Sequence, residues 1–404
     1  MLNLKTERGM SNPTSAELIQ RARDMAPTMA QRAVVCEQLG RLPDETYEDF
    51  REAGFYRIVQ PKAFGGYEMD LMTLFDVSKE IARGGCASSA WVLSILAIHN
   101  YYLGYFDPKA QVDIWGEDDN NQTCTPFNPS GTVTKVTGGV EVKGGRWTFA
   151  SGCDHSAFAL IGVLIDHGDG NPPEFCQCVV PKGEFNIDHD SWNVAGLKGS
   201  GSKDLTVDEI FVPQHRIFSL TKVTQGFAPG REINTGPLYK QAFFPPSINS
   251  LVAPACGAAL HALDTFEEKM KSRTLVFGAG DQIEKVPSLI RLVEAESEIE
   301  AAEMLIKRDS IELMKLAEQG KQASQQLLAR TLHSNAFGAT VFTRAVERLF
   351  VASGGGALQN DHPMQRAWRD VHTINNHGGL NFDSTAELYG KVRMGLPGGS
   401  ALLG

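Results

Sequence analysis

The sequence has no long apolar run and no cysteine framework. Its longest apolar candidate, residues 90–97, is soon followed by His99 and Asn100 and is too short to span a membrane. Residues 1–18 lack the apolar segment of a signal peptide. The seven cysteines are scattered and odd in number, which indicates free thiols. We therefore expect a soluble protein of the reducing cytoplasm, with no membrane partner.

Positive charge is also scarce. The 38 Lys and Arg residues are outnumbered by 48 Asp and Glu residues, which gives a net charge of -10. Because non-specific nucleic-acid binding needs clustered Lys and Arg, this balance argues against a nucleic-acid partner. The nearest cysteine pair, Cys176 and Cys178, is separated by one residue, which is not the spacing of a zinc site. We therefore expect no metal.

Residues 14–118 have the pattern of helices. Apolar residues recur at helical intervals from Leu18 onward. The segment LPDETYEDFREAGFYRI has an acidic first turn after Pro43, and its helix is expected to stop at Gly54. Two further helices are expected between residues 74 and 106, with a break near Gly84 and Gly85. The second is apolar nearly all round, which predicts a buried helix.

The pattern of residue types changes twice more along the chain. Residues 119–218 alternate short β-branched or aromatic runs with Gly, Asn and Pro turns, which predicts antiparallel strands. Residues 219–404 contain two long helical patterns, 288–317 and 322–353, which indicate a bundle. The predicted fold class is α+β, with an N-terminal helical domain (14–118), a central antiparallel β domain (119–218) and a C-terminal four-helix-bundle domain (219–404).

Four motifs occur in an order that resembles the acyl-CoA dehydrogenase family. They are GFYRIVQPKAFGGYEMD (54–70), RWTFASG (146–152), GLKGSGSKDLTVDEIFVP (196–213) and ASGGGALQNDHPMQRAWRD (352–370). Together they extend over almost the whole chain. The resemblance implies an acyl-CoA dehydrogenase-like fold with a flavin site.

The segment WRDVHTINNHGGL (368–380) resembles one branch of this family, the flavin-dependent monooxygenases. These enzymes have a histidine at the position of His377, where a dehydrogenase has its carboxylate base, and a second one at the position of His99. The resemblance implies a two-component enzyme and usually a homotetramer. It would take reduced flavin (FMNH2 or FADH2) from a separate NAD(P)H-flavin reductase, trap O2 as a C4a-hydroperoxyflavin, and hydroxylate an aromatic, phenolic substrate.

Three catalytic residues follow from this resemblance: His377, His99 and Ser151. A neutral imidazole at His377 can take a phenolic proton or hand one to the leaving hydroxide. It can equally be a helix-end histidine bonded to carbonyls, and His372 is a competing candidate. His99 is expected to donate to the phenol oxygen, although a lone histidine in an apolar segment is often only a satisfied core residue.

The resemblance also implies the cofactor contacts. The Ser151 hydroxyl would lie against flavin N5, and Trp147 and Phe149 would wall the ring. Without the resemblance, RWTFASG is simply a strand that ends in a Ser-Gly turn. The remaining expected ligands are Arg273 and Phe277 at the phosphate end across a subunit boundary, Gly354 and Gly355 where backbone approaches the cofactor, Arg369 beside it, and Thr123 and Thr125 on the substrate side.

Several alternatives remain open at the level of sequence. A true acyl-CoA dehydrogenase would need a carboxylate base, and Asp383 and Glu387 do not lie in that family's usual context. An N- or S-oxidising relative would share the flavin chemistry and differ in its pocket. A non-catalytic flavin-fold scaffold is a fourth reading. The sequence does not separate FMN from FAD and does not name the substrate.

Overall fold

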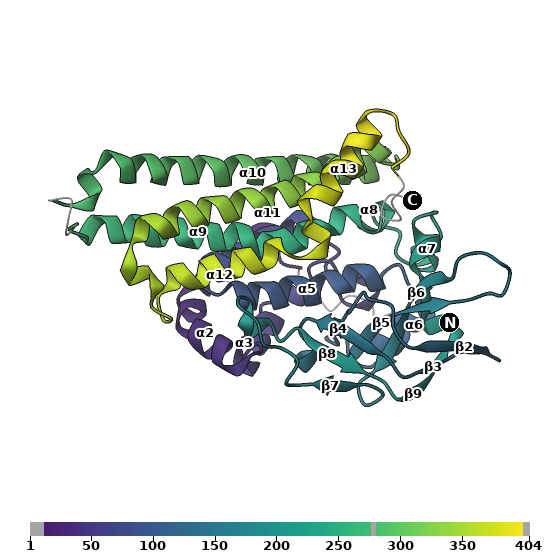
Figure 1. Cartoon of the computed structure of the whole chain (residues 1–404). Helices are drawn as coiled ribbons and strands as arrows, with labels where there is room; N and C mark the ends of the chain where they lie inside the picture. The colour runs from purple at the N-terminus through teal and green to yellow at the C-terminus, as the bar shows by residue number, and fades with distance from the viewer. Residues whose placement is uncertain (1–11, 276–279, 399–404) are drawn as a thin grey trace.

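The computed structural model describes residues 12–275 and 280–398. The chain passes from a first group of helices, through short strands, to a bundle of longer helices (Figure 1). The first group consists of α1 (Ser15–Asp24), α2 (Ala26–Leu39), α3 (Asp44–Glu52), α4 (Leu71–Arg83), α5 (Ala87–Leu103) and α6 (Pro108–Trp115). This order confirms the helix–β–helix arrangement expected from the sequence.

Helix α5 is the centre of the molecule. All 17 of its residues are buried, as its apolar composition predicts. It lies between the strands and the bundle in Figure 1 and contacts β1, α4, α9 and α12. The break before it is also confirmed, because α4 ends at Arg83 and Gly85 has a φ of +99°. Side chains on α5 are therefore held by packing on every side.

The strands form three small sheets. Their orders are β1-β5-β6-β10, β2-β3-β9 and β4-β8-β7, and all pairs are antiparallel except β1 with β5. A separate hydrophobic core fills the space between them. The strands are β1 (Thr123–Cys124), β2 (Thr132–Val136), β3 (Gly139–Lys143), β4 (Arg146–Ala150), β5 (Phe158–Ile165), β6 (Glu174–Pro181), β7 (Asn186–Asp188), β8 (Lys203–Thr206), β9 (Glu209–Pro213) and β10 (Ile217–Ser219).

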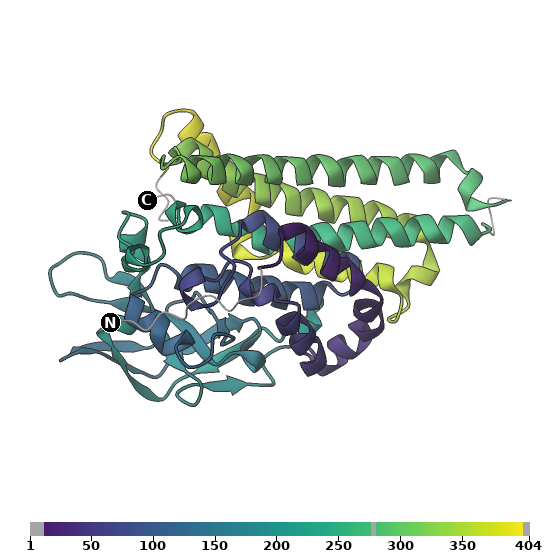
Figure 2. The same cartoon turned by 180° about the vertical axis from the view of Figure 1, so that it is seen from behind.

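The last part of the chain is helical, and its long helices run side by side in both views (Figures 1 and 2). Helix α9 packs against α10, α11 and α12, and also against α4. The two long helical patterns are confirmed, with slightly different ends, as α10 and α11. The helices are α7 (Leu220–Val223), α8 (Pro237–Lys240), α9 (Asn249–Ser272), α10 (Val286–Glu318), α11 (Gln325–Ser353), α12 (Pro363–Asn375) and α13 (Phe382–Arg393).

One continuous hydrophobic core joins the first helices to the bundle. It extends from Leu18 of α1 to Leu388 of α13. The division at residues 118 and 218 therefore stays a prediction about domain boundaries. None of the helices described is at once long enough and apolar enough to traverse a bilayer.

Candidate active site

A cavity of about 1170 Å³ lies where α5, the strands and the bundle meet. Pockets for a single drug-sized ligand usually enclose about 300–1,000 Å³, so this one has room for two small molecules. It is lined by five of the residues predicted from the sequence (His99, Thr125, Phe149, Ser151 and His377) and by aromatic residues that the sequence reasoning did not single out (Trp91, Tyr102, Phe127, Trp192 and Phe244).

Ser151 is held in place by a tryptophan of the central helix. Trp91 Nε1 donates to Ser151 Oγ at 3.1 Å, and Ser151 Oγ lies 2.7 Å from Ser202 Oγ. Phe149, two residues earlier, has a φ of 65°, at a register shift of the β4–β8 pair between Trp147 and Ala150. Such a bulge re-aims side chains. It leaves the Phe149 ring 67% exposed and edge-on to Trp192, with 6.2 Å between ring centroids.

The prediction for Trp147 needs correction. Its side chain is fully buried among the core residues of the strands and does not line the cavity. Trp147 Nε1 donates to the Gly162 carbonyl at 2.7 Å, which satisfies the indole within the core. The physical reason is the bulge after Trp147, because it breaks the alternation that would otherwise place Trp147 and Phe149 on one face. Trp192, from the loop after β7, lies beside Phe149 instead.

His99 has a defined tautomer. Its Nδ1 lies 2.6 Å from the Thr123 carbonyl oxygen. A carbonyl can only accept, so Nδ1 carries the hydrogen. Burial lowers the pKa of the His99 imidazole to about 4, and the ring is therefore neutral at pH 7. The other nitrogen, Nε2, is then an acceptor.

His377 has the opposite tautomer. It follows α12 and caps the short 3₁₀ turn Gly378–Leu380, where its Nδ1 accepts the Gly379 N–H at 3.1 Å. The ring is exposed within the cavity, and the surrounding protein lowers the pKa of His377 to about 4. The neutral ring therefore carries its hydrogen on Nε2, which is a donor. Trp91 lies against it, with 5.5 Å between ring centroids.

The competing histidine lies elsewhere. His372 packs on Trp368 and faces Glu347, with its Nε2 at 3.5 Å from the carboxylate. It does not line the cavity, although the neighbouring Thr373 does. His372 lies within α12, whereas His377 lies beyond the end of that helix, where the backbone has left the helical path, so the two side chains point to different sides. The structure thus brings His377, and not His372, together with His99.

Aromatic rings surround the end of the cavity at His99. The Tyr102 ring lies 6.0 Å from the His99 ring and 6.0 Å from Phe127, and Phe127 lies 5.9 Å from Phe244. Thr125 Oγ1 is buried beside them without a hydrogen-bond partner among the residues described. The Thr123 side chain does not line the cavity, and its contribution is the carbonyl that orients His99.

One other predicted ligand, Arg273, lies in a separate pocket of about 270 Å³, which Gln282, Ser353 and Gly356 also line. Arg273 Nη1 donates to the Ser353 carbonyl at 2.6 Å. Gly354 has a φ of +70°, and a Cβ there would come within 2.3 Å of the Arg273 guanidinium. Gly355 has open space around it. Phe277 lies outside the described residues.

Arg369 does not line the cavity either. Its guanidinium donates to the Ala195 carbonyl at 2.8 Å and pairs with Glu37 at 2.8 Å. The next residue, Asp370, accepts the Leu197 N–H at 2.6 Å. Ala195 and Leu197 both line the cavity. Arg369 and Asp370 therefore hold the backbone of Ala195 and Leu197, which forms part of the cavity wall. The sequence motif alone did not reveal this role.

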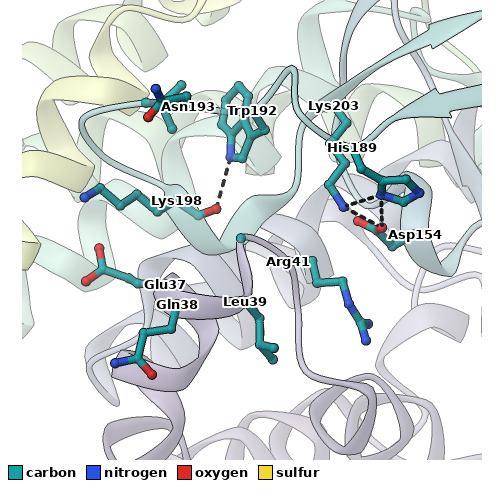
Figure 3. A pocket seen from close by; sticks show the side chains of 12 residues that line it. Glu37, Gln38, Leu39, Arg41, Asp154, His189, Trp192, Asn193, Lys198 and Lys203 are labelled. Atoms are coloured by element: carbon teal, nitrogen blue, oxygen red, sulfur yellow. Dashed lines mark hydrogen bonds and ion pairs between the residues drawn. The ribbon is translucent and has the colours of Figure 1, made fainter.

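A polar pocket of about 490 Å³ borders the cavity (Figure 3). Lys203 Nζ pairs with Asp154 at 2.6 Å and contacts His189 Nδ1 at 3.2 Å. Trp192 lines both spaces, and its Nε1 donates to the Lys198 carbonyl at 3.0 Å. Lys203, Asp154 and His189 thus bind one another, whereas Glu37, also in this pocket, pairs with Arg369 outside it.

Carboxylates are few in the cavity. Glu387 is the acidic residue among those described that line it, and it pairs with Lys391 one turn later on α13. Asp383 does not line it. Within residues 12–275 and 280–398, no three His, Cys, Asp or Glu side chains are grouped so as to hold a metal ion.

Comparison with known proteins agrees with this arrangement. Residues 12–111 match the family model "Acyl-CoA dehydrogenase, N-terminal domain", and residues 250–382 match "Acyl-CoA dehydrogenase, C-terminal domain". The chain is 34% identical over 380 residues to the flavin-dependent monooxygenase oxygenase subunit HsaA of Rhodococcus jostii, covering 94% of this chain and 98% of that protein.

Two further similarities point the same way. The chain is 29% identical over 390 residues to the oxygenase component of an FADH(2)-dependent resorcinol hydroxylase from a Rhizobium species, covering 94% of each. The crystal structure of 3-HSA hydroxylase from Rhodococcus sp. RHA1 superposes with a TM-score of 0.89 at 34% identity, covering 96% of this chain and 98% of that one.

Proposed function

The chain belongs to the acyl-CoA dehydrogenase family, in its branch of flavin-dependent monooxygenases, and we propose that its cavity positions a phenolic substrate beside reduced flavin for hydroxylation with O2. Proteins of this branch are oxygenase components of two-component systems, which implies a separate flavin reductase and an aromatic substrate. The observation that carries the proposal is the pair His99 and His377, two neutral imidazoles of opposite tautomer in one cavity.

The residues present fit a flavin. The cavity has room for a ring system and a substrate together, and its lining includes Phe149, which is 67% exposed, and Trp192 edge-on to it. Ser151 Oγ lies beside them, close to where a ring packed on Phe149 would present its edge. When bound, reduced flavin activates O2 and delivers one oxygen atom to the substrate ring. We propose that Phe149 and Trp192 hold the ring and that Ser151 bonds to its N5.

The protein's own part is to move protons and keep water out. His99 Nε2 is an acceptor, so His99 takes the proton of the substrate hydroxyl, and the ring carbon ortho to a phenolate is the better nucleophile. His377 Nε2–H is a donor, so His377 supplies a hydrogen bond to the oxygen that leaves. The donor role is one of the two that the sequence left open for His377, whereas His99 was expected to donate to the phenol oxygen and is here proposed to accept.

The arrangement does not suit the dehydrogenase alternative. Removing a proton from the α-carbon of an acyl-CoA requires a carboxylate poised within the site. Glu387 is 65% exposed on its side chain and is neutralised by Lys391. An N- or S-oxidising enzyme remains a variant of the proposal and differs in the atom that is oxidised.

We also propose that the chain is a homotetramer. The exposed apolar residues of α10 fall on one stripe along its whole length, since their spacing follows the helical period. They are Val286, Ile290, Val293, Met304 and Ile311, each more than half exposed. A second copy that packs there would bury this stripe. Light scattering should give four times the chain mass for the native protein, and Ile290→Asp with Met304→Asp should dissociate it.

A cytoplasmic location is the remaining part of the proposal. All seven cysteines are free and buried. Unpaired thiols in this number are typical of a reducing compartment. It is also the compartment that supplies NAD(P)H to a flavin reductase.

The test is oxidation of flavin in the presence of the protein. Reduced FAD or FMN is mixed with the protein and then with O2. We expect flavin reoxidation at least tenfold slower than in free solution, and product in place of hydrogen peroxide when a phenol is added. Reoxidation at the free rate would contradict the proposal. Bleaching of bound FAD by an acyl-CoA would establish the dehydrogenase instead. Ser151→Ala should release hydrogen peroxide faster, and Ser151→Thr should not.

A further inference from the structure

We infer that the substrate is an uncharged phenol with a hydrophobic substituent, and that phenolic acids are excluded by the charge and shape of the cavity. This inference rests on the proposed function. It concerns what lies around the phenol ring rather than the reaction at its hydroxyl group. Three features of the cavity support it: the pairing of its charges, the prior engagement of its amides, and the aliphatic wall beyond the aromatic rings.

The charges of the cavity are already paired. Lys391 is the one Lys or Arg among the described residues that line it, and its Nζ lies 2.5 Å from Glu387. Both side chains are substantially exposed, at 44% and 65%. Residues 399–404, which follow the lining residue Gly398, contain no Lys or Arg. A carboxylate inside the cavity would therefore meet no free cation from these segments.

The amide donors are also engaged. Asn128 and Asn376 are the amide side chains that line the described cavity. Asn128 Nδ2 donates to the Arg146 carbonyl at 3.1 Å, and Asn376 Nδ2 donates to the His372 carbonyl at 2.8 Å. Thr125 Oγ1 has no partner, but it lies at the aromatic end with His99. It suits the substrate hydroxyl, not a distant charge.

The wall that the bundle contributes to the cavity is aliphatic. Leu251 comes from α9, Leu332 from α11 and Leu388 from α13, and all three are buried and line the cavity. Leu251 and Ile248 lie close to Gly379, which follows His377. The lining of the cavity thus combines the rings of Tyr102 and Phe244 with His377 and these leucines. A phenol held at His99 would place a substituent against that wall.

Desolvation sets the expected preference. Burying a carboxylate without a partner costs several kcal/mol, whereas an alkyl group of the same size gains by leaving water. A matched pair of ligands isolates this effect: para-hydroxyphenylpropanoate and para-isopentylphenol, which have a carboxylate and an isopropyl group at the same position. The methyl ester of the acid removes the charge and keeps both oxygens.

The first experiment measures binding and turnover on the wild-type protein. Anaerobic calorimetry with reduced FAD bound should give a Kd for isopentylphenol at least about 100-fold below that for the propanoate. The methyl ester should bind close to isopentylphenol. The kcat/KM for hydroxylation should follow the same order. Equal or tighter binding of the propanoate overturns the inference and leaves the proposed function intact, because both phenols would still be hydroxylated.

The second experiment introduces a cation at the aliphatic wall. Leu388→Lys should improve kcat/KM for the propanoate at least tenfold relative to isopentylphenol. Phe211→Lys places the same charge on β9, outside the cavity, and should keep the wild-type ranking. An unchanged ranking in a folded Leu388→Lys protein overturns the inference. Failure of the protein to slow flavin reoxidation overturns the proposed function, and this inference with it.

Discussion

His99 and His377 face one cavity with their ring hydrogens on opposite nitrogens. His99 donates from Nδ1 to the Thr123 carbonyl, and His377 accepts at Nδ1 from the Gly379 N–H. Both are neutral, since enclosure lowers each pKa to about 4. One ring can therefore only accept at Nε2 and the other can only donate. An aromatic hydroxylase needs this combination, because a proton must leave the substrate and another must reach the departing oxygen.

Replacing His99 should make hydroxylation depend on the ionisation of the substrate itself. In His99→Leu we expect product formation at pH 7 to fall by about 10²–10⁴-fold. It should recover as pH rises toward the phenol's own pKa near 10, and product per flavin between pH 6 and 9.5 measures this. His372→Leu, outside the cavity, should behave as wild type. A loss of the same size at every pH would contradict a base role for His99.

The donor role of His377 can be separated from its bulk. In Gln, the side-chain amide N–H reaches about as far as Nε2–H of histidine. His377→Gln should therefore keep most of the coupling of O2 use to product, and His377→Ala should lose about tenfold, the value of one hydrogen bond. The ratio of product to hydrogen peroxide is the measurement. Both variants should still bind flavin. Normal coupling in His377→Ala would exclude the role.

Trp147 and Trp192 should respond differently to substitution by Phe. Trp147→Phe removes one of two hydrogen bonds to the Gly162 carbonyl, which still accepts from the Ser130 N–H at 3.1 Å, and should lower the free energy of unfolding by about 0.5–1.5 kcal/mol without changing flavin affinity. Trp192→Phe should weaken flavin binding and leave stability nearly unchanged. Urea unfolding and flavin titration of both variants give the comparison. Weaker flavin binding in Trp147→Phe would show that Trp147 contacts the flavin after all.

Stability should depend on pH through Asp370. Burial raises the pKa of its carboxyl to about 7, against about 4 for an unfolded chain. The folded state thus holds the proton more tightly, so the free energy of unfolding falls as pH rises from about 4 to about 7.

Asp370→Asn keeps an oxygen that accepts the Leu197 N–H and removes the buried charge. We expect it to be more stable than wild type at pH 8 by about 1–3 kcal/mol and to lose the decline between pH 4 and 7. Thermal unfolding from pH 4.5 to 8 checks this. Asp361→Asn changes an exposed carboxyl and should leave the pH profile as it is. The same decline in Asp370→Asn would contradict the assignment.

The fold was predictable because its signals are local. Helical periodicity is visible over the whole of α10, and α5 is apolar on every side, so both follow from residues a few positions apart. The order of the four motifs then indicated the family. Ser151 and His377 were also predictable, because each belongs to a family motif and lines the cavity.

The differences between the expected and the observed site have another origin. The tautomer of His99 depends on a carbonyl 24 residues away, and that of His377 on the turn after it. Helical and strand patterns carry no information about either. Trp147 was misplaced because a single bulge changes which face of β4 a side chain occupies. Trp192 was missed because a loop tryptophan has no periodic neighbours that would place it.

Because α5 is completely buried, the cavity is lined by two kinds of residue: those fixed in the core and those near the surface. Trp91, His99 and Tyr102 sit on a helix in which no residue is free to change without disturbing the core. Helix α13 lies at the edge of the molecule with many exposed residues and tolerates substitution more readily. Related proteins that diverge in sequence would therefore keep the α5 residues and the oxygen chemistry, and would change the residues that select the substrate. A library built on α13 is therefore the direct route to new specificity.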